Sequence, residues 1–449
     1  MLLIKNGYLI DPGNHREGKN DILIENGKIT QIKEEIKMEQ AAAFRQEGED
    51  IQIIDADGLV IAPGLVDVHV HFRDPGFTYK EDIETGAKAA AKGGFTTVVL
   101  MANTKPVVDQ ADTLQYILEK GKKTGIHVES CVTVTKGMQG KELTNMSELK
   151  AAGAVGVTDD GVPLLEEGLA RRAMERAAKA GMPISFHEED PAYIENNGIN
   201  RGKASEYFGI GGSDRQAEIS MIKRDLEIAL ETGAVINIQH ISTKEGVELV
   251  RQAKRKGSNI HAEATPHHFT LNEEAAIEYG TLAKMNPPLR EEEDRLAIIE
   301  GLKDGTIDLI ATDHAPHSEE EKKKKITEAP SGIIGLETSF SLGIARLVNT
   351  GYLSMMELME KMSYNPAKLY GLPGGTIEEG APADLVIFDQ EKTWRADSFV
   401  SKSSNSPFLG KTMTGQVCYT ICNGKIVYKN VDESRIFHND LNRQRRHGG

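Results

Sequence analysis

Residues 64–71 read Gly-Leu-Val-Asp-Val-His-Val-His, and residues 72–76 continue with Phe-Arg-Asp-Pro-Gly. The apolar run predicts a buried strand, and the Pro-Gly pair predicts a turn directly after it. A strand directs alternate side chains to opposite faces, so His69 and His71 are expected on the same face. Two imidazoles in this arrangement can bind one Zn²⁺, although an isolated His-x-His is equally compatible with two half-buried histidines.

The middle of the chain alternates short apolar strands with helical segments. This order is typical of βα units around a parallel sheet. Eight strands with crossover helices over about 300 residues predict an α/β fold, a closed TIM-like (β/α)8 barrel. The expected strands are Leu65–His71, Thr96–Met101, His127–Thr135, Ala154–Thr158, Pro183–His187, Val235–His240, Asn259–Ala264 and Asp308–Asp313. The expected helices include Tyr79–Lys92, Leu165–Ala180, Asp214–Glu231, Thr243–Lys256, Glu292–Leu302, Leu336–Leu347 and Met355–Met362.

Both chain ends are rich in short strands and tight turns. Asn-Gly pairs at 26–27 and 423–424 each separate two apolar runs, which is a strong hairpin signal. Because the same pattern flanks the barrel on both sides, we expect the two ends to build one small β-sandwich module. The polar C-terminal tail has little to bury and is expected to be loosely held or docked on a neighbour. The expected boundaries are 1–62 and 375–432 for the module, 63–374 for the catalytic barrel and 433–449 for the tail.

Composition excludes several classes of function. The chain has 449 residues, a formal net charge of −15 and a pI near 5.4, which argues against a surface for nucleic acid or anionic lipid. No stretch approaches the roughly 18 apolar residues of a membrane span, and we expect a cytoplasmic protein. Three scattered cysteines, Cys131, Cys418 and Cys422, are too few for a disulfide framework and are expected to be buried thiols.

Histidine or aspartate ends five of the eight expected strands, at the rim where a barrel of this type carries its chemistry. One tetrahedral Zn²⁺ would be saturated by three histidines and an aspartate, whereas a hydrolytic site keeps a position open for water. Four histidines and two carboxylates therefore favour two ions, about 3.5–4 Å apart, that share a hydroxide. His69, His71 and Asp313 are expected on one ion and His187 and His240 on the other, with a bridging carboxylate between them.

Several motifs together resemble the dihydroorotases of the amidohydrolase superfamily over nearly the whole chain. The two main motifs are residues 67–76 and 311–317, and the shorter ones are 101–104, 158–161 and 285–290. The resemblance implies zinc-dependent, reversible interconversion of N-carbamoyl-L-aspartate and (S)-dihydroorotate, the third step of de novo pyrimidine (UMP) synthesis. It also implies Asp313 as the group that takes the proton of the attacking hydroxide and passes it to the leaving nitrogen.

The bridging carboxylate is expected at the end of the fourth strand, which reads Thr158-Asp159-Asp160-Gly161. Many amidohydrolases bridge their metals with a carboxylated lysine, and this strand contains none. It resembles the bacterial type I dihydroorotases, in which an aspartate takes that place. The family pattern selects Asp160 as the bridge, with Asp159 as a supporting or turn residue.

The resemblance also implies a set of substrate contacts. Arg73 offers a planar fork suited to a substrate carboxylate. Ser331 departs from the bulkier residue of the family pattern, which makes its backbone contact less secure. The implied contacts are His71, Arg73, Asn103, Asn286, His317 and the backbone of Ser331 and Gly332.

Alternatives remain open on the sequence. A hydantoinase or allantoinase would use a similar barrel, but Arg73 and the missing lysine weigh against both. A non-catalytic scaffold for aspartate carbamoyltransferase is the alternative from a different class. A homodimer and a complex with that enzyme are partner assemblies that the sequence does not decide. The charged run 318–325 reads as a solvated loop, or more specifically as part of a lid over the substrate.

Overall fold

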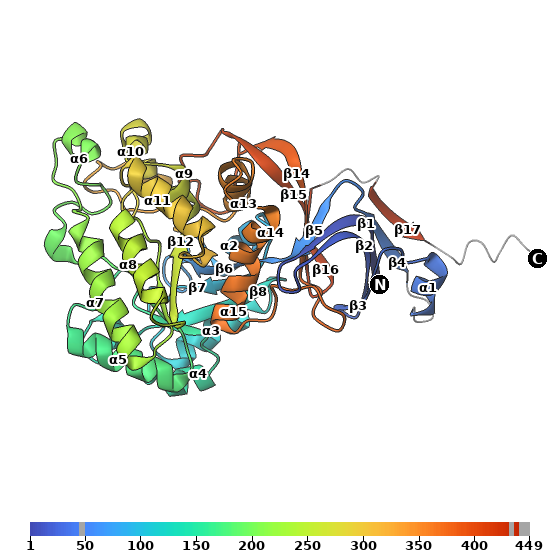
Figure 1. Ribbon diagram of the computed structural model, residues 1–449, viewed down its shortest axis with the longest axis horizontal. Coiled ribbons are helices and arrows are strands. Elements are labelled where there is room, and N and C mark those ends of the chain that lie inside the picture. Colours follow the sequence, from blue (N-terminus) through green and yellow to red (C-terminus); the bar gives the residue numbers. More distant parts are fainter. Residues whose placement is uncertain (45–49, 431–434, 440–449) are drawn as a thin grey trace, which may run out of the picture.

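The computed structural model describes residues 1–44, 50–430 and 435–439. A barrel and a sheet built from both chain ends lie side by side in it (Figure 1). Within those residues, no helix has both the length and the apolar character that crossing a membrane requires. The three cysteines are free and buried, as expected.

Eight parallel strands form the barrel, and strands consecutive in the sequence are neighbours in space. The barrel closes where the His71 N–H donates to the His314 carbonyl at 2.9 Å, beside a parallel bridge between Val70 and His314. The predicted (β/α)8 fold is therefore confirmed. The strands are β6 (Leu65–Val70), β7 (Phe95–Leu100), β8 (His127–Val132), β9 (Gly156–Thr158), β10 (Ile184–Phe186), β11 (Ile236–Ile238), β12 (Ile260–Ala264) and β13 (Leu309–Ile310).

Helices in the connections surround these strands. The longer ones are α2 (Ile83–Lys92), α3 (Ala111–Gly121), α5 (Glu167–Ala180), α7 (Gln216–Thr232), α8 (Lys244–Lys254) and α11 (Glu292–Lys303). The shorter ones are α4 (Met146–Ala151), α6 (Lys203–Phe208), α9 (Pro266–Thr270), α10 (Glu274–Tyr279), α12 (Glu319–Lys322), α13 (Ser339–Gly343), α14 (Met355–Met359) and α15 (Asn365–Tyr370).

Two examples show how predicted helices differ from those in the structure. The first was expected from Tyr79, but α2 begins at Ile83, because Asp82 caps it by accepting the Thr85 N–H at 2.8 Å. The helix expected over Leu336–Leu347 is α13, which continues as the π-helical segment Ile344–Val348.

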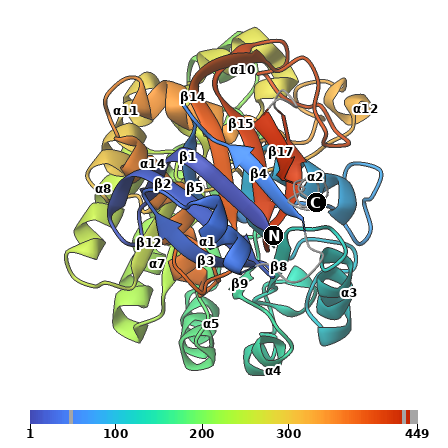
Figure 2. The ribbon, with the colours of Figure 1, turned by 90° about the vertical axis from the view of Figure 1, so that its right-hand side faces the viewer.

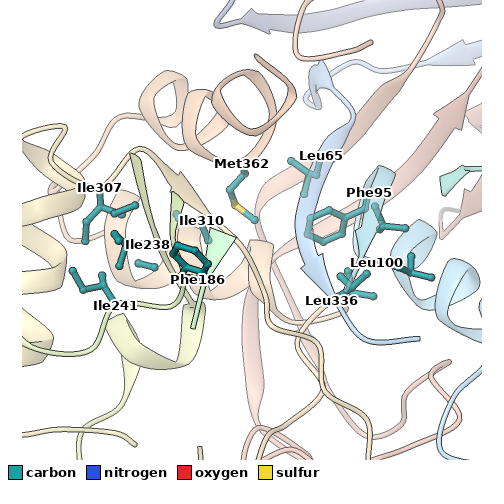
Figure 3. Close-up of a cluster of buried hydrophobic side chains, with 14 of the residues drawn as sticks. Leu65, Phe95, Leu100, Phe186, Ile238, Ile241, Ile307, Ile310, Leu336 and Met362 are labelled. Carbon is teal, nitrogen blue, oxygen red and sulfur yellow. The ribbon is translucent and has the colours of Figure 1, made fainter. Parts of the chain in front are cut away.

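A large apolar core fills the space around the barrel strands (Figure 3). Leu65, Phe95 and Phe186 belong to it and are almost fully buried. Each such side chain contributes about 1.5–3 kcal/mol relative to exposure. In contrast, Asn237 and Glu263 are buried and polar, with Asn237 donating to Glu263 at 2.9 Å. The apolar layer thus holds a polar network among the strands.

Both chain ends form one continuous sheet of nine strands, which faces the viewer in Figure 2. Its order is β16-β15-β14-β5-β1-β2-β3, and β1 also pairs with β4. Because β5 pairs with β1 on one side and β14 on the other, it joins the N-terminal half to the C-terminal half, and the expected composite module is confirmed. The strands are β1 (Leu2–Asp11), β2 (Arg16–Glu25), β3 (Lys28–Lys33), β4 (Ile51–Asp55), β5 (Val60–Pro63), β14 (Leu385–Arg395), β15 (Thr412–Cys422), β16 (Lys425–Lys429) and β17 (Ile436–Asn439).

The strand β17 corrects one expectation. Residues 436–439 belong to the tail that was expected to be loosely held or docked on a neighbour, outside the β-module, but they pair antiparallel with β4 of that module. The free edge of β4 offers backbone groups that a short extended segment can satisfy. The other tail residues, 433–434 and 440–449, lie outside the described part of the chain, and 435 directly precedes β17.

Candidate metal centre

Six side chains that the sequence singles out as metal ligands converge at one rim of the barrel. They come from the carboxyl ends of β6, β9, β10, β11 and β13, and all six are buried. The parallel strands end at this one rim of the barrel, which brings the six side chains together. The residues are His69, His71, Asp160, His187, His240 and Asp313.

The Asp160 carboxylate lies between the two groups of histidines. Its Oδ2 is 3.4 Å from His71 Nε2, and its Oδ1 is 3.5 Å from His69 Nε2. The same Oδ1 is 3.7 Å from both His187 Nδ1 and His240 Nε2. One carboxylate thus faces four histidine nitrogens from three strands, β6, β10 and β11.

Asp313 closes the group on the other side. Its Oδ1 lies 3.0 Å from His71 Nε2 and 3.4 Å from His69 Nε2. Burial raises the pKa of Asp313, but the neighbouring charge of His69 and the hydrogen bond with His71 outweigh it and hold the pKa well below its usual range. Asp313 is therefore a carboxylate at neutral pH.

The donor set fits a divalent metal. His69 Nε2 and Asp160 Oδ1 are buried and have no hydrogen-bond partner among the described residues. Buried polar atoms without partners are rare, and here they point toward other nitrogen and oxygen ligands. Imidazole and carboxylate together are the ligands of zinc and related ions.

Asp159 takes a different direction from Asp160. Its Oδ1 accepts the Val134 N–H at 2.7 Å and the Thr135 N–H at 3.2 Å, and its Oδ2 accepts the Thr135 hydroxyl. It ties the β9 loop to the β8 loop and lies outside the group of ligands.

Several buried side chains behind the ligands were not predicted. Glu263 Oε1 lies 2.6 Å from His69 Nδ1, and Glu189 Oε2 lies 3.0 Å from His187 Nε2. Carboxylates in these positions fix the tautomer of a ligating histidine. The only sequence signal for Glu263 was a carboxylate between two alanines in a buried strand.

Asp67 connects the first and last strands of the barrel. It accepts the His69 N–H at 3.1 Å and the Thr312 N–H at 3.2 Å. Burial raises its pKa to about 7, against the lowering effect of these hydrogen bonds. Asp67 lies two residues before His69, and its partner Thr312 directly precedes Asp313, so it joins the two segments that carry these side chains.

The backbone is strained at three rim residues. Arg73, His240 and Asp313 have φ values of 60°, 30° and 48°, in the left-handed region that side chains disfavour. Such conformations persist where surrounding structure enforces them and are concentrated at functional sites. The strain lies on the loops that direct these side chains to the rim.

A cavity of about 390 Å³ opens above the ligands. All the predicted site residues except His69, which is fully buried, contribute to its wall. These are His71, Arg73, Asn103, Asp160, His187, His240, Asn286, Asp313, His317, Ser331 and Gly332. A larger hollow of about 880 Å³ lies among the hairpins of the end sheet, but no histidine, cysteine or carboxylate is among its described lining residues.

Several of the expected substrate contacts already have protein partners, among them Asn103 and His317. Asn103 Oδ1 lies 3.0 Å from His71 Nδ1, and its amide nitrogen donates to Asp160 at 3.3 Å. His317 donates from Nε2 to the Ser331 carbonyl at 2.9 Å, while its Nδ1 accepts from Lys80 at 3.3 Å. Burial and the nearby Arg73 lower the pKa of His317 to about 2, so the ring is neutral.

The charged run after the eighth strand is partly helical. Ser318 caps α12 by accepting the Glu321 N–H, and Glu321 accepts the Tyr79 hydroxyl at 3.0 Å and pairs with Lys80 at 2.9 Å. Lys322 is buried, whereas Lys323 is exposed. The segment is therefore attached to the loop that follows β6.

The remaining histidines near the rim contact protein groups. His268 contacts the Thr265 hydroxyl at 2.7 Å and the Pro287 carbonyl at 3.1 Å. His314 accepts the Gly335 N–H at 3.1 Å. Burial lowers the pKa of His267 to about 4. His268 and His314 are therefore engaged by protein hydrogen bonds.

A (β/α)8 barrel with buried histidines and aspartates at the carboxyl ends of its strands defines a class of metal-dependent enzymes. Comparison with known proteins makes this specific. Residues 60–427 match the Amidohydrolase family. The dihydroorotase of Clostridioides difficile (strain 630) is 57% identical over 428 residues, covering 95% of this chain and 100% of that protein. The dihydroorotase of Clostridium acetobutylicum is 51% identical over 431 residues, with coverage of 96% and 100%.

Solved structures share the fold at lower sequence identity. An L-hydantoinase (dihydropyrimidinase) from Arthrobacter aurescens superimposes with a TM-score of 0.83 at 27% identity, covering 96% of each chain. A D-hydantoinase (dihydropyrimidinase) from Thermus sp. gives a TM-score of 0.81 at 24% identity, covering 96% of this chain and 97% of that one. The chain belongs to the amidohydrolase family and, within it, to the dihydroorotases.

Proposed function

We infer that this chain catalyses the reversible hydrolysis of (S)-dihydroorotate to N-carbamoyl-L-aspartate, with ring closure as the reaction in pyrimidine synthesis. The relatives named dihydroorotase support it at 57% and 51% identity over nearly their whole length. The observation that carries it in the structure is the cavity in which the ligand group, Arg73 and Asn286 lie together.

We propose that the centre holds two Zn²⁺ ions with Asp160 between them. His69, His71 and Asp313 would hold one ion, and His187 and His240 the other. This assignment is supported by Asp160, whose Oδ2 faces His71 while its Oδ1 faces the other three histidines. When bound, the ions polarise the substrate carbonyl and lower the pKa of a bound water to about 7.

The protein's own residues divide the remaining work. Asp313, held as a carboxylate, takes the proton of the attacking water and delivers it to the ring nitrogen that leaves. Ring closure is the reverse. Asn103 fixes the orientation of the His71 ring and the Asp160 carboxylate relative to each other through its two hydrogen bonds.

Recognition of the substrate carboxylate is assigned to Arg73. Its guanidinium donates to the Pro316 carbonyl at 3.3 Å, which fixes the side chain at the cavity wall. A planar fork at this position suits bidentate binding of a carboxylate. Asn286 and the backbone of Ser331 and Gly332 complete the proposed contacts.

The test is an assay of dihydroorotate hydrolysis with metal content measured on the same sample, beside hydantoin and allantoin. We expect turnover of dihydroorotate with about two zinc ions per chain. Faster turnover of hydantoin or allantoin than of dihydroorotate would contradict the proposal and indicate a hydantoinase or an allantoinase. Absence of turnover after zinc addition would favour the non-catalytic scaffold. The presence of all six candidate ligands argues against that alternative. Light scattering, alone and with aspartate carbamoyltransferase, tests whether the chain forms a homodimer or a complex with that enzyme.

A further inference from the structure

Four consecutive carbonyl groups beside the cavity each accept a hydrogen bond from a side chain. Lys284 donates to Ala329 at 2.7 Å, and Lys322 donates to Pro330 at 2.9 Å. His317 donates to Ser331 at 2.9 Å. The Gly332 carbonyl accepts from Lys322 at 3.0 Å and from Asn405 at 3.1 Å. The carbonyls of segment 329–332 are thus directed toward protein donors.

Two of these donors are lysines in an unusual environment. Lys284 and Lys322 are only 5% and 4% exposed, and neither forms an ion pair within the described residues. Lysine is almost never buried without a partner. Lys284 also donates to the Ile326 carbonyl at 2.7 Å, so each amine serves two carbonyl groups.

The hydrogen bonds that Lys284 and Lys322 donate to these carbonyls do not depend on a positive charge. Burial lowers the pKa of Lys322 to about 7 and also lowers the pKa of Lys284. A neutral amine keeps two N–H donors, which is the number of carbonyls that each lysine serves. Hydrogen bonding therefore accounts for the burial of both side chains.

Segment 329–332 is also fixed through its backbone at Gly332. The Gly332 N–H donates to the Lys284 carbonyl at 2.8 Å. Gly332 has φ +112°, and a Cβ there would lie 2.7 Å from the Ala315 Cβ, so only glycine fits. Backbone and side chain of Lys284 thus both contact the segment.

We propose that Lys284 and Lys322 are positioning residues for substrate binding, which hold segment 329–332 with its carbonyls turned from the cavity. This inference rests on the proposed function. A carboxylate substrate is repelled by carbonyl oxygens and attracted by a backbone N–H. Pro330 has no N–H, and those of Ala329 and Gly332 donate to the Lys325 and Lys284 carbonyls, so Ser331 carries the N–H that this segment can offer to an anion. Lys284 also lines the cavity, but its amine is engaged by the Ile326 and Ala329 carbonyls, so in this proposal both lysines act through the backbone.

The experiment compares the metal-loaded Lys284→Met and Lys322→Met enzymes with the parent. Methionine keeps most of the volume and removes the donors. Lys361→Met is the matched control, because Lys361 is 6% exposed and donates to the Ile307 carbonyl at 3.2 Å, before β13 and away from the rim. Two readouts are used: hydrogen–deuterium exchange of residues 326–334 without substrate, and KM and kcat for dihydroorotate.

We expect faster exchange in both variants and not in the control, with KM raised about tenfold and kcat within about twofold. Parent-like exchange and KM in both would overturn the inference. A fall in kcat at unchanged KM would also overturn it. If the parent does not turn over dihydroorotate, the proposed function fails, and exchange alone decides whether the lysines hold the segment. A methionine variant that does not fold is replaced by the glutamine variant, which must show the same changes.

Discussion

Asp313 is held as a carboxylate and lies at the cavity wall, where it can accept a proton. We expect Asp313→Asn to lower kcat by about 10²–10⁴-fold, because the amide cannot take a proton from water. Much of the metal should remain bound, since the other ligands are unchanged. Steady-state kinetics with metal analysis measures both. Asp112→Asn, at an exposed carboxylate on α3, is the control, and near-parent turnover by Asp313→Asn would remove Asp313 from this role.

Glu263 provides a second test at a single residue. Because its carboxylate lies 2.6 Å from His69 Nδ1, Glu263→Gln should loosen the orientation of that ring. We expect metal affinity to fall roughly 10–100-fold, measured by competition with a chelator. The same substitution at exposed Glu320 is the control. Unchanged affinity would show that the barrel alone orients His69.

The convergence of the six candidate ligands could be predicted because each lies at the end of an apolar strand, and the side chains of parallel strands meet at one rim. Asp160 could be preferred to Asp159 only through the family resemblance. Glu263 and Lys284 could not be predicted, because their partners are distant in the sequence. Lys322 stands in a charged run that reads as solvated, and only the fold shows that it turns inward.

At the level of secondary structure, α12 is attached to the loop after β6 through Glu321. Glu321→Ala removes the contacts with Tyr79 and Lys80 and the reciprocal cap with Ser318. If the segment covers the substrate, we expect KM to rise roughly threefold to tenfold, equivalent to about 0.7–1.4 kcal/mol. The loss of unfolding free energy should stay near 1 kcal/mol, because the ion pair is partly exposed. Kinetics and denaturation measure these, and parent-like KM would favour a merely solvated segment.

Element boundaries were less predictable than element types. Asp82 ends the loop before α2, although the helical pattern extends back to Tyr79. The end of the chain shows the opposite error, since β17 forms only because β4 offers a free edge. A four-residue strand has no periodic pattern long enough to find, and its partner is more than 380 positions away.

For the whole molecule, the barrel and the end sheet are joined by buried contacts. Leu65 at the start of β6 follows directly from β5, and the Gly64 N–H donates to the Asp384 carbonyl at 2.9 Å. The Thr420 hydroxyl of β15 donates to the Ala91 carbonyl at 2.6 Å. The end sheet thus supports the strand that carries His69 and His71, and a change at this junction should affect global stability.

The pair of His127 on β8 and Asp384 beside β14 makes this junction sensitive to pH. Their side chains lie 2.9 Å apart, and the hydrogen bond to Asp384 raises the pKa of His127 above its ordinary value of 6.5, against the lowering effect of burial. Because the pKa of His127 is higher in the folded state than in the unfolded state, its protonation stabilises the fold fully below pH 6.5. This stabilisation is lost as the pH rises through the pKa of His127 in the folded protein. His127→Gln should therefore cost about 1 kcal/mol of unfolding free energy at pH 6 and less at pH 9. Urea denaturation of the metal-loaded parent and variant at both pH values measures the difference, with exposed His15→Asn as control. An equal cost at both pH values would show that His127 stabilises the junction without its charge.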